Sequence, residues 1–362
     1  MRGIRTSIVV IIFTLICIGI MMIYSSSGVY AMQELGDSLY FLKRHIFFLI
    51  FGFIVTFFVM AIDYRDLRKY AKPLLLISAV LLVAVLIPGI GKESYGARRW
   101  FKFGTFYFQP SEVAKLAILI YVADFLARKQ DRIRSFKEGF LPVIVVMGFV
   151  CLLILKQPDL GSTLLVASLV IIMLFIAGAR VGHIILLGVL SSPAFYFLIY
   201  KVPYRWTRII TFINPWKDSQ GAGFQLTQSQ IAFGSGGLWG VGLGKSVQKL
   251  FYLPAAHTDF ILSIVGEELG FMGALTIIIL FICFIWQGAR IAKRTWDPFG
   301  YFLSIGIVAM IGVQALVNIG VSIGALPTKG LPLPFISYGG SALVFTMISV
   351  GLLLNISRIQ DL

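Results

Sequence analysis

The chain has 362 residues, of which 58% are hydrophobic and only 13% charged, and its mean hydropathy is +0.91. Soluble domains carry about 25% charged residues, so this composition excludes a soluble protein and predicts a polytopic membrane protein. The net charge of +15 does not indicate a nucleic-acid partner, because the basic residues lie in short segments between apolar runs, where membrane topology and anionic lipids explain them better.

Ten apolar runs are long enough to cross about 30 Å of hydrocarbon. Because every backbone polar group must be satisfied in lipid, these runs are expected to be helices. They lie at about residues 8–25, 45–62, 73–88, 111–127, 140–155, 160–178, 182–200, 260–285, 299–324 and 336–356. The chain is therefore expected to form a single all-α membrane domain over residues 1–362.

Alternate short loops between these runs are basic. They are the N-terminus with Arg2 and Arg5, and residues 63–72, 127–139 and 288–294. The positive-inside rule places these loops, and hence both termini, in the cytoplasm. Cations are also plentiful on the opposite face, and an anionic ligand at the outer surface would explain them.

The first outer segment with notable residues is "GARRWFKFG", which starts at residue 96. It interleaves Arg98, Arg99 and Lys102 with aromatic residues, a pattern typical of a segment that lies in the headgroup plane. Simple anchoring explains it, but so does contact between an arginine and a lipid phosphate through bidentate hydrogen bonds.

Two further polar stretches lie at the outer ends of predicted helices. "QPSEVAKLA" places Glu112 and Lys115 three residues apart, on one helix face, either as a structural ion pair or as a charged wall of a polar cavity. "KQPDLGST" places Asp159 after Pro158, where a tight turn alone explains it.

Residues 201–259 form a segment that is too long for a plain connector. Its aromatic, Leu and Ile content argues against disorder, so we expect an ordered re-entrant or interfacial cap. "GKS" at 244–246 is not a P-loop, because Trp239 stands where the pattern needs glycine and no strand precedes it. The glycines between Gly234 and Gly244 more simply give tight turns, and exposed amides there, with Lys245, are a candidate contact for anionic oxygens.

Asp259 lies where this loop enters the eighth apolar run, within "YLPAAHTDFILSIVGEELG". An aspartate there could be an N-cap, but it is also near water and lipid headgroups at once. His257 could orient or tune it. Glu267 and Glu268 are expected about two helical turns deeper, where acidic residues are functional by default, although at most one of them faces the Asp259 side.

Taken in order, these stretches resemble the SEDS family of bacterial cell-wall proteins, the family of FtsW and RodA. The match spans nearly the whole chain and also includes "GFQLTQSQIAFGSGGLWGVGLGKS" and "LPTKGLPLPFISYGGS". "QKLFYLPAAHTDFI" and "PTKGLPLPF" are more similar to the division branch of the family than to the elongation branch.

The resemblance implies a peptidoglycan glycosyltransferase in the bacterial cytoplasmic membrane that polymerises lipid II at the outer face. It also implies a class B penicillin-binding protein and other division membrane proteins as partners. It places the catalytic aspartate at Asp259, and further functional positions at Glu112, Lys115, the arginines of "RRW" and a glutamate of "GEE".

The implied reaction sets chemical requirements that these residues can meet. The acceptor hydroxyl attacks the donor sugar at C1 with inversion, and a carboxylate must accept its proton, a role expected for Asp259. The departing undecaprenyl pyrophosphate needs positive charge, which Arg99, Lys115 or a divalent cation such as Mg²⁺ or Mn²⁺ could supply.

Several alternatives remain open at the level of sequence. Asp259 could be a metal ligand instead of a base, although Cys17, Cys151 and Cys283 lie far apart in apolar runs and no Cys or His cluster predicts zinc. A transporter that flips a lipid-linked precursor would also suit ten spans with charged residues inside them. A scaffold that only recruits the transpeptidase is a third reading.

Overall fold

The computed structural model describes residues 1–94, 96–104, 106–254 and 256–360. Tyr95 and Thr105, which flank the segment "GARRWFKFG", and Ala255, which precedes Asp259 by four residues, lie outside the described residues. Each of the ten predicted spans overlaps helix in the structure, and the eighth span is divided between two helices. The helices are α1 (Arg2–Leu35), α2 (Tyr40–Ala61), α3 (Leu67–Ala84), α4 (Pro110–Arg128), α5 (Leu141–Leu155), α6 (Leu160–Ile176), α7 (Val181–Tyr200), α10 (Ile261–Glu268) followed by α11 (Gly270–Arg294), α12 (Pro298–Ser322) and α13 (Gly340–Ile359).

Seven helical segments in the described part of the chain are long and apolar enough to cross a membrane, which confirms an all-α multi-pass membrane protein. The other three predicted spans, α3, α4 and α6, are too charged or too short to count among these seven. Charged residues begin α3 and recur along α4, and α6 has only 17 residues. In α4 these charges include Glu112 and Lys115, so the departure from a plain apolar span marks a polar part of the interior.

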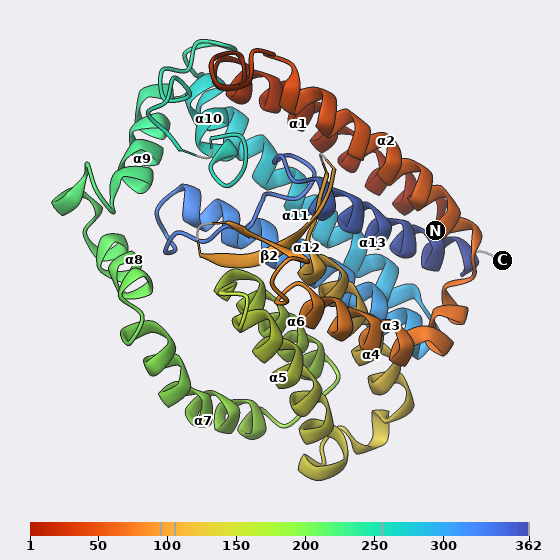
Figure 1. The fold of residues 1–362 in the computed structure, drawn as a ribbon. Helices are drawn as coiled ribbons and strands as arrows, with labels where there is room; N and C mark the ends of the chain where they lie inside the picture. The colour runs from red at the N-terminus through yellow and green to blue at the C-terminus, as the bar shows by residue number, and fades with distance from the viewer. Residues whose placement is uncertain (95, 105, 255, 361–362) are drawn as a thin grey trace.

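Helix α12 lies at the centre of the bundle, packed against α4, α6 and α11 (Figure 1). Helix α13 packs along α2, and α3 packs along α4. Helix α7 stands apart: no described side chain of it is buried, and its main neighbour is the loop helix α8 (Pro203–Ile213). The termini meet on one side of the bundle, where the guanidinium of Arg5 donates to the Ser357 carbonyl at 3.4 Å.

The predicted continuous helix over residues 260–285 is wrong, because the structure breaks it into α10 and α11. Gly270 has a φ of +69°, and a Cβ there would lie 2.3 Å from the Gly240 nitrogen. The backbone of the preceding loop fills this space: the amides of Val241 and Gly242 donate to the carbonyls of Glu267 and Glu268. Glu267 and Glu268 therefore contact the loop and do not lie inside a continuous span.

The segment expected to lie flat in the headgroup plane is a small antiparallel sheet. Its strands are β1 (Gly91–Ser94), β2 (Ala97–Phe103) and β3 (Phe106–Phe108), in that spatial order. Residues Phe101 and Phe103 alternate with Trp100 and Lys102 along β2, which suits the two faces of a strand. The sheet leads directly into α4, so it fixes the approach to Glu112 and Lys115.

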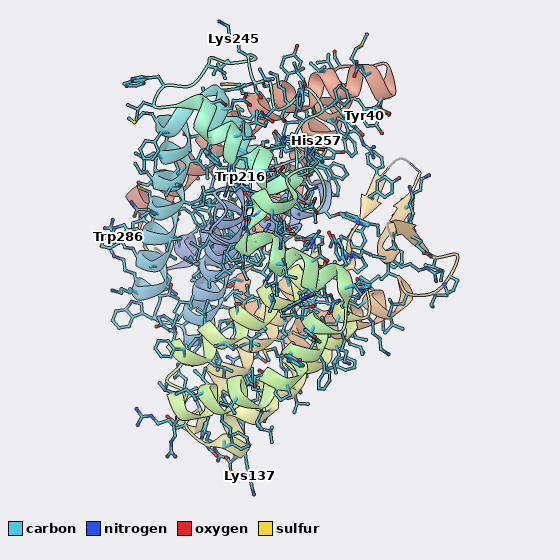
Figure 2. The ribbon with its side chains drawn as sticks, turned by 90° about the vertical axis from the view of Figure 1, so that its left-hand side faces the viewer. Tyr40, Lys137, Trp216, Lys245, His257 and Trp286 are labelled. Carbon is cyan, nitrogen blue, oxygen red and sulfur yellow. The ribbon has the colours of Figure 1, made fainter. Side chains whose placement is uncertain are left out.

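The long segment 201–259 is largely ordered into short elements. It contains α8, a single 3₁₀ turn at Pro215–Asp218 and α9 (Phe224–Gly236), and it ends in a series of turns that leads to Asp259. Helix α9 packs on α10. Lys245, in the turns after α9, and Lys137, before α5, lie at opposite ends of the molecule (Figure 2).

Candidate active site

Asp259 sits in the turn that precedes α10, near the C-terminal end of the central helix α12. The side-chain amide of Asn318 on α12 donates to the Asp259 carbonyl at 2.9 Å and to the Leu331 carbonyl at 2.8 Å. One asparagine therefore joins the aspartate to the loop that follows α12. In that loop Gly330 leaves space for the carboxylate, since a Cβ there would lie 3.4 Å from Oδ2 of Asp259.

The Asp259 carboxyl is half-buried, and its surroundings change its acidity. Burial raises the pKa of Asp259 to about 6, the Arg208 guanidinium lowers it, and the Asp159 carboxylate raises it further. Desolvation disfavours the charged form of a carboxyl, which explains the direction of the largest effect. A carboxylate with this pKa is mostly ionised at pH 7 yet accepts a proton more readily than an ordinary aspartate.

Two cations accompany Asp259 that the sequence analysis did not single out. Arg208 on α8 donates from Nη1 to the Thr328 carbonyl at 2.9 Å and also contacts the Tyr204 hydroxyl. Lys329 follows Thr328, and burial lowers its pKa. No hydrogen-bond or ion-pair partner of the Lys329 ammonium is found among the described residues, although its carbonyl accepts from the Leu331 amide at 3.0 Å. In the sequence, Lys329 is distinguished only by its place in "LPTKGLPLPF". Nothing in the sequence marks Arg208 as a site residue except the unusual length of the segment that contains it.

Asp159 is more than a turn residue. It caps α6 by accepting from the Ser162 amide at 3.0 Å and the Ser162 hydroxyl at 2.8 Å, and the Gln109 amide donates to it at 3.3 Å. Arg99 holds the same turn, because its guanidinium donates to the carbonyls of Gln157 at 2.9 Å and Pro158 at 2.5 Å. Arg99 is thus committed to a backbone turn near the site.

Arg98 and the α4 pair also have partners of their own. Arg98 pairs with Glu93 across β1 and β2 at 2.9 Å, on the exposed side of the sheet. Glu112 and Lys115 form a buried ion pair at 2.7 Å. The Lys115 ammonium also approaches Oε1 of Gln314 at 3.5 Å, and Gln314 donates to the Pro332 carbonyl at 2.9 Å. The pair therefore supports the loop that carries Lys329.

His257 contributes packing and no charge. Its ring lies against Phe41, with 4.4 Å between ring centroids, and near Tyr30 and Tyr338 (Figure 2 shows the position of His257). Burial lowers the pKa of His257 to about 4, so the ring is neutral at pH 7. Its carbonyl accepts from the Tyr338 amide at 3.0 Å, which fastens the Asp259 turn to the start of α13.

The glutamates of α10 and Lys245 lie apart from Asp259 and its cations. Glu267 caps a turn of the loop by accepting from the Ser246 hydroxyl and from the Val247 amide at 2.9 Å. Glu268 pairs with Lys249 at 2.7 Å. Lys245 is exposed at one tip of the molecule, well away from His257 (Figure 2).

No group of three His, Cys, Asp or Glu side chains that could hold a metal ion is found among the residues that the structure describes. Magnesium, however, is commonly held by one or two carboxylates together with substrate phosphates. The half-buried Asp259 carboxylate could serve in such a set, whereas Asp159 is already engaged by Ser162 and Gln109. A divalent cation therefore stays a prediction.

The chain is similar to known bacterial proteins over nearly its whole length. Residues 5–361 match the model of the FtsW, RodA and SpoVE family, described as cell cycle proteins. A probable peptidoglycan glycosyltransferase FtsW of Geobacter sulfurreducens is 50% identical, over 95% of this chain and 92% of that relative. The stage V sporulation protein E of Bacillus subtilis is 46% identical, over 97% of this chain and 96% of that protein.

Solved structures agree with the fold. A chain of a peptidoglycan synthase complex superposes with a TM-score of 0.80 at 27% identity, covering 98% of this chain and 97% of that one. The rod shape determining protein RodA of Thermus thermophilus superposes with a TM-score of 0.73 at 28% identity and the same coverage.

Proposed function

This chain belongs to the FtsW, RodA and SpoVE family, and from that premise we propose that it is a peptidoglycan glycosyltransferase acting in septal cell-wall synthesis. One observation carries the chemical part of the proposal. A half-buried carboxylate, Asp259, has a pKa of about 6 and lies near the Arg208 guanidinium, and Lys329 precedes Gly330, whose backbone approaches that carboxylate. That combination suits a reaction that removes a proton at one atom and releases a diphosphate at another.

The proposed substrate is lipid II, which carries a disaccharide-peptide on an undecaprenyl pyrophosphate. The acceptor sugar's 4-hydroxyl attacks C1 of the donor sugar, the bond from C1 to the pyrophosphate oxygen breaks, and the configuration at C1 inverts. A hydroxyl is a poor nucleophile, so Asp259 accepts its proton as the new bond forms. The product is a glycan strand that is one disaccharide longer.

The positive charge for the leaving group is assigned differently from the expectation based on sequence. Arg99 is bound to the carbonyls of Gln157 and Pro158, and Lys115 is neutralised by Glu112. Lys329 stands on the loop whose Gly330 approaches the Asp259 carboxylate, and Arg208 on α8 is bound to the Thr328 carbonyl of that loop. No carboxylate forms an ion pair with either cation among the described residues. They are the cations that we assign to the departing diphosphate. A divalent cation bound with the diphosphate would add to this charge.

The proposal includes a place and partners. Reaction at the outer face of the bacterial cytoplasmic membrane follows from the predicted orientation, with both termini cytoplasmic. A structural relative is part of a peptidoglycan synthase complex, which supports an association with a class B penicillin-binding protein that cross-links the strands. Other division membrane proteins are expected to join them.

The decisive assay separates a polymerase from a flippase of lipid-linked precursor. The full chain, purified with its penicillin-binding protein, is placed in liposomes with labelled lipid II. Glycan strands resolved by gel electrophoresis support the proposal. Movement of labelled lipid II between leaflets without any polymer would contradict it and favour the transporter. Polymer made with equal yield by the penicillin-binding protein alone would also contradict it.

A further inference from the structure

A pocket lies between α1 and the loop before α10, outside the Asp259 site. It has a volume of about 620 Å³, within the range of roughly 300–1,000 Å³ that is typical of small-molecule sites. One face of α1 forms its wall and residues of the turns after α9 form its opposite side. Its lining includes Met21, Tyr24, Ser25, Gly28 and Met32 of α1 and Lys249 of the loop.

The pocket opens at the membrane boundary. Helix α1 starts at Arg2, and about 20 residues cross the hydrocarbon core, so the pocket residues near Ser25 lie at the boundary on the side of the loop. Along α1 the lining runs from Met21 to Gln33, about 18 Å at 1.5 Å per residue. Met21, Tyr24 and Met32 are exposed, so hydrocarbon can enter from the bilayer. The apolar wall thus continues from the hydrocarbon zone towards the headgroup zone.

The floor of the pocket is polar and built from buried groups. The Lys249 side chain is 6% exposed and pairs at 2.7 Å with Glu268, whose side chain is 0% exposed. Lys249 also donates to the Ser25 hydroxyl at 3.0 Å, and that hydroxyl lies 2.7 Å from the Glu268 carboxylate. An ammonium has three N–H donors. The third donor of Lys249 finds no acceptor among the described residues, and Lys249 lines the pocket.

The charge on this floor selects the chemistry of a ligand. Glu268 already neutralises Lys249, so a phosphate placed directly against the floor would add a negative charge that no cation of the pair is left to balance. A neutral acceptor, such as an ester carbonyl, can take the remaining N–H without that cost. A glycerophospholipid has ester carbonyls between its acyl chains and its phosphate, whereas a polyprenyl phosphate has its charge directly at the end of the chain.

We propose that this pocket binds one glycerophospholipid of the leaflet on the loop side, which is expected to be the outer leaflet. An ester carbonyl accepts from Lys249, and an acyl chain lies against Met21 and Tyr24. The flexible thioethers of Met21 and Met32 suit a chain of variable shape. Bound lipid then supports the junction of α1, the loop and α10, which the Lys249–Glu268 pair already joins.

The test uses the full chain in nanodiscs of phosphatidylethanolamine and phosphatidylglycerol, with a trace of phosphatidylglycerol that carries a photoactivatable acyl chain. Crosslinked peptides are mapped by mass spectrometry. Label is expected to concentrate on α1 between residues 21 and 33. Gly28→Leu, which fills the pocket at a position whose Cβ would have its nearest neighbour at 3.8 Å, is expected to lower this label at least fivefold. Gly3→Leu on the same helix, where a Cβ meets nothing within 4 Å, leaves it unchanged.

A second variant tests the floor without leaving a buried carboxylate unpaired. Lys249→Met combined with Glu268→Gln is expected to lower the label several-fold, as the loss of one hydrogen bond predicts. The proposal would be overturned if Val10 and Phe13, exposed elsewhere on α1, were labelled as strongly as residues 21–33. It would also be overturned if neither Gly28→Leu nor the double variant lowered the label. Displacement of the label by undecaprenyl phosphate would overturn it as well. The last result would assign the pocket to a polyprenyl lipid.

Discussion

At the scale of single residues, the site depends on how charges around Asp259 are balanced. Burial raises the pKa of Asp259, Arg208 opposes that rise and Asp159 adds to it. A protonated carboxyl cannot accept the proton of the acceptor hydroxyl, so activity is lost as pH falls through the pKa. The acid limb of kcat/KM for the wild-type protein is expected near pH 6.

Arg208→Gln should move this acid limb to higher pH, because removal of a nearby cation makes the Asp259 carboxylate harder to form. Asp159→Asn should move it to lower pH, because a nearby negative charge is lost while the amide can still cap α6. The pH profile of lipid II polymerisation measures both shifts. If neither variant moved the acid limb of the pH profile, a group other than Asp259 would be responsible for it.

The buried ion pair on α4 gives a prediction about stability. Lys115→Met leaves the Glu112 carboxylate buried without its partner, which should cost about 3–5 kcal/mol. The matched double variant with Glu112→Gln should recover most of that loss, since no charge is then left unpaired. Denaturation in detergent followed by circular dichroism compares the three proteins. Equal stability of the single and double variants would contradict the interpretation.

At the scale of elements, the break between α10 and α11 depends on Gly270. Ala at this position must adopt a left-handed conformation and would collide with the backbone of Leu238 and Gly240. Gly270→Ala should therefore lower the thermal midpoint by several degrees. Gly182→Ala on α7, where a Cβ meets nothing within 4 Å, serves as the control. Its thermal midpoint should equal or exceed that of the wild-type protein, because alanine favours helix more than glycine does. If Gly270→Ala were as stable as the control, the backbone between α10 and α11 would be able to accommodate a Cβ, which would contradict this account.

The helices were largely predictable from the sequence, and the reasons are local. Long apolar runs identify α1, α2, α12 and α13 without tertiary information. The break at Leu269 and Gly270 was not predictable, because the apolar pattern continues through it and the cause is backbone contact with a distant loop. The sheet at residues 91–108 was missed because its aromatic and basic residues also suit a membrane anchor.

The candidate site was predictable only in part, for a similar reason. Asp259 stands out as a charge at the edge of an apolar run, and that signal is local. Arg208 and Lys329 become relevant only because α8 and the loop after α12 meet near this carboxylate. Arg99 and Lys115 carry suitable charges, but their partners in the fold, the Gln157 carbonyl and Glu112, cannot be read from the sequence.

At the scale of the whole molecule, the central prediction is the orientation in the membrane. Lys245 and Lys137 lie at opposite ends of the molecule, and His257, two residues before Asp259 in the sequence, lies towards the end with Lys245 (Figure 2). A membrane-impermeant maleimide should label Lys245→Cys in intact cells and Lys137→Cys only after permeabilisation. Replacing the native Cys17, Cys151 and Cys283 removes background. The reverse labelling pattern would place the site in the cytoplasm and exclude the proposed reaction.

The polymerisation rate of Asp259→Asn tests the proposed proton acceptor most directly. The variant is purified with its penicillin-binding protein and supplied with labelled lipid II, beside Asp218→Asn as a matched change in the same outer loop, where Asp218 accepts from the Ala222 amide. Loss of at least 10²-fold in Asp259→Asn, with wild-type elution from size exclusion and near-normal polymer from Asp218→Asn, is the expected result. Wild-type polymer from Asp259→Asn would contradict the assignment of this carboxylate as the base.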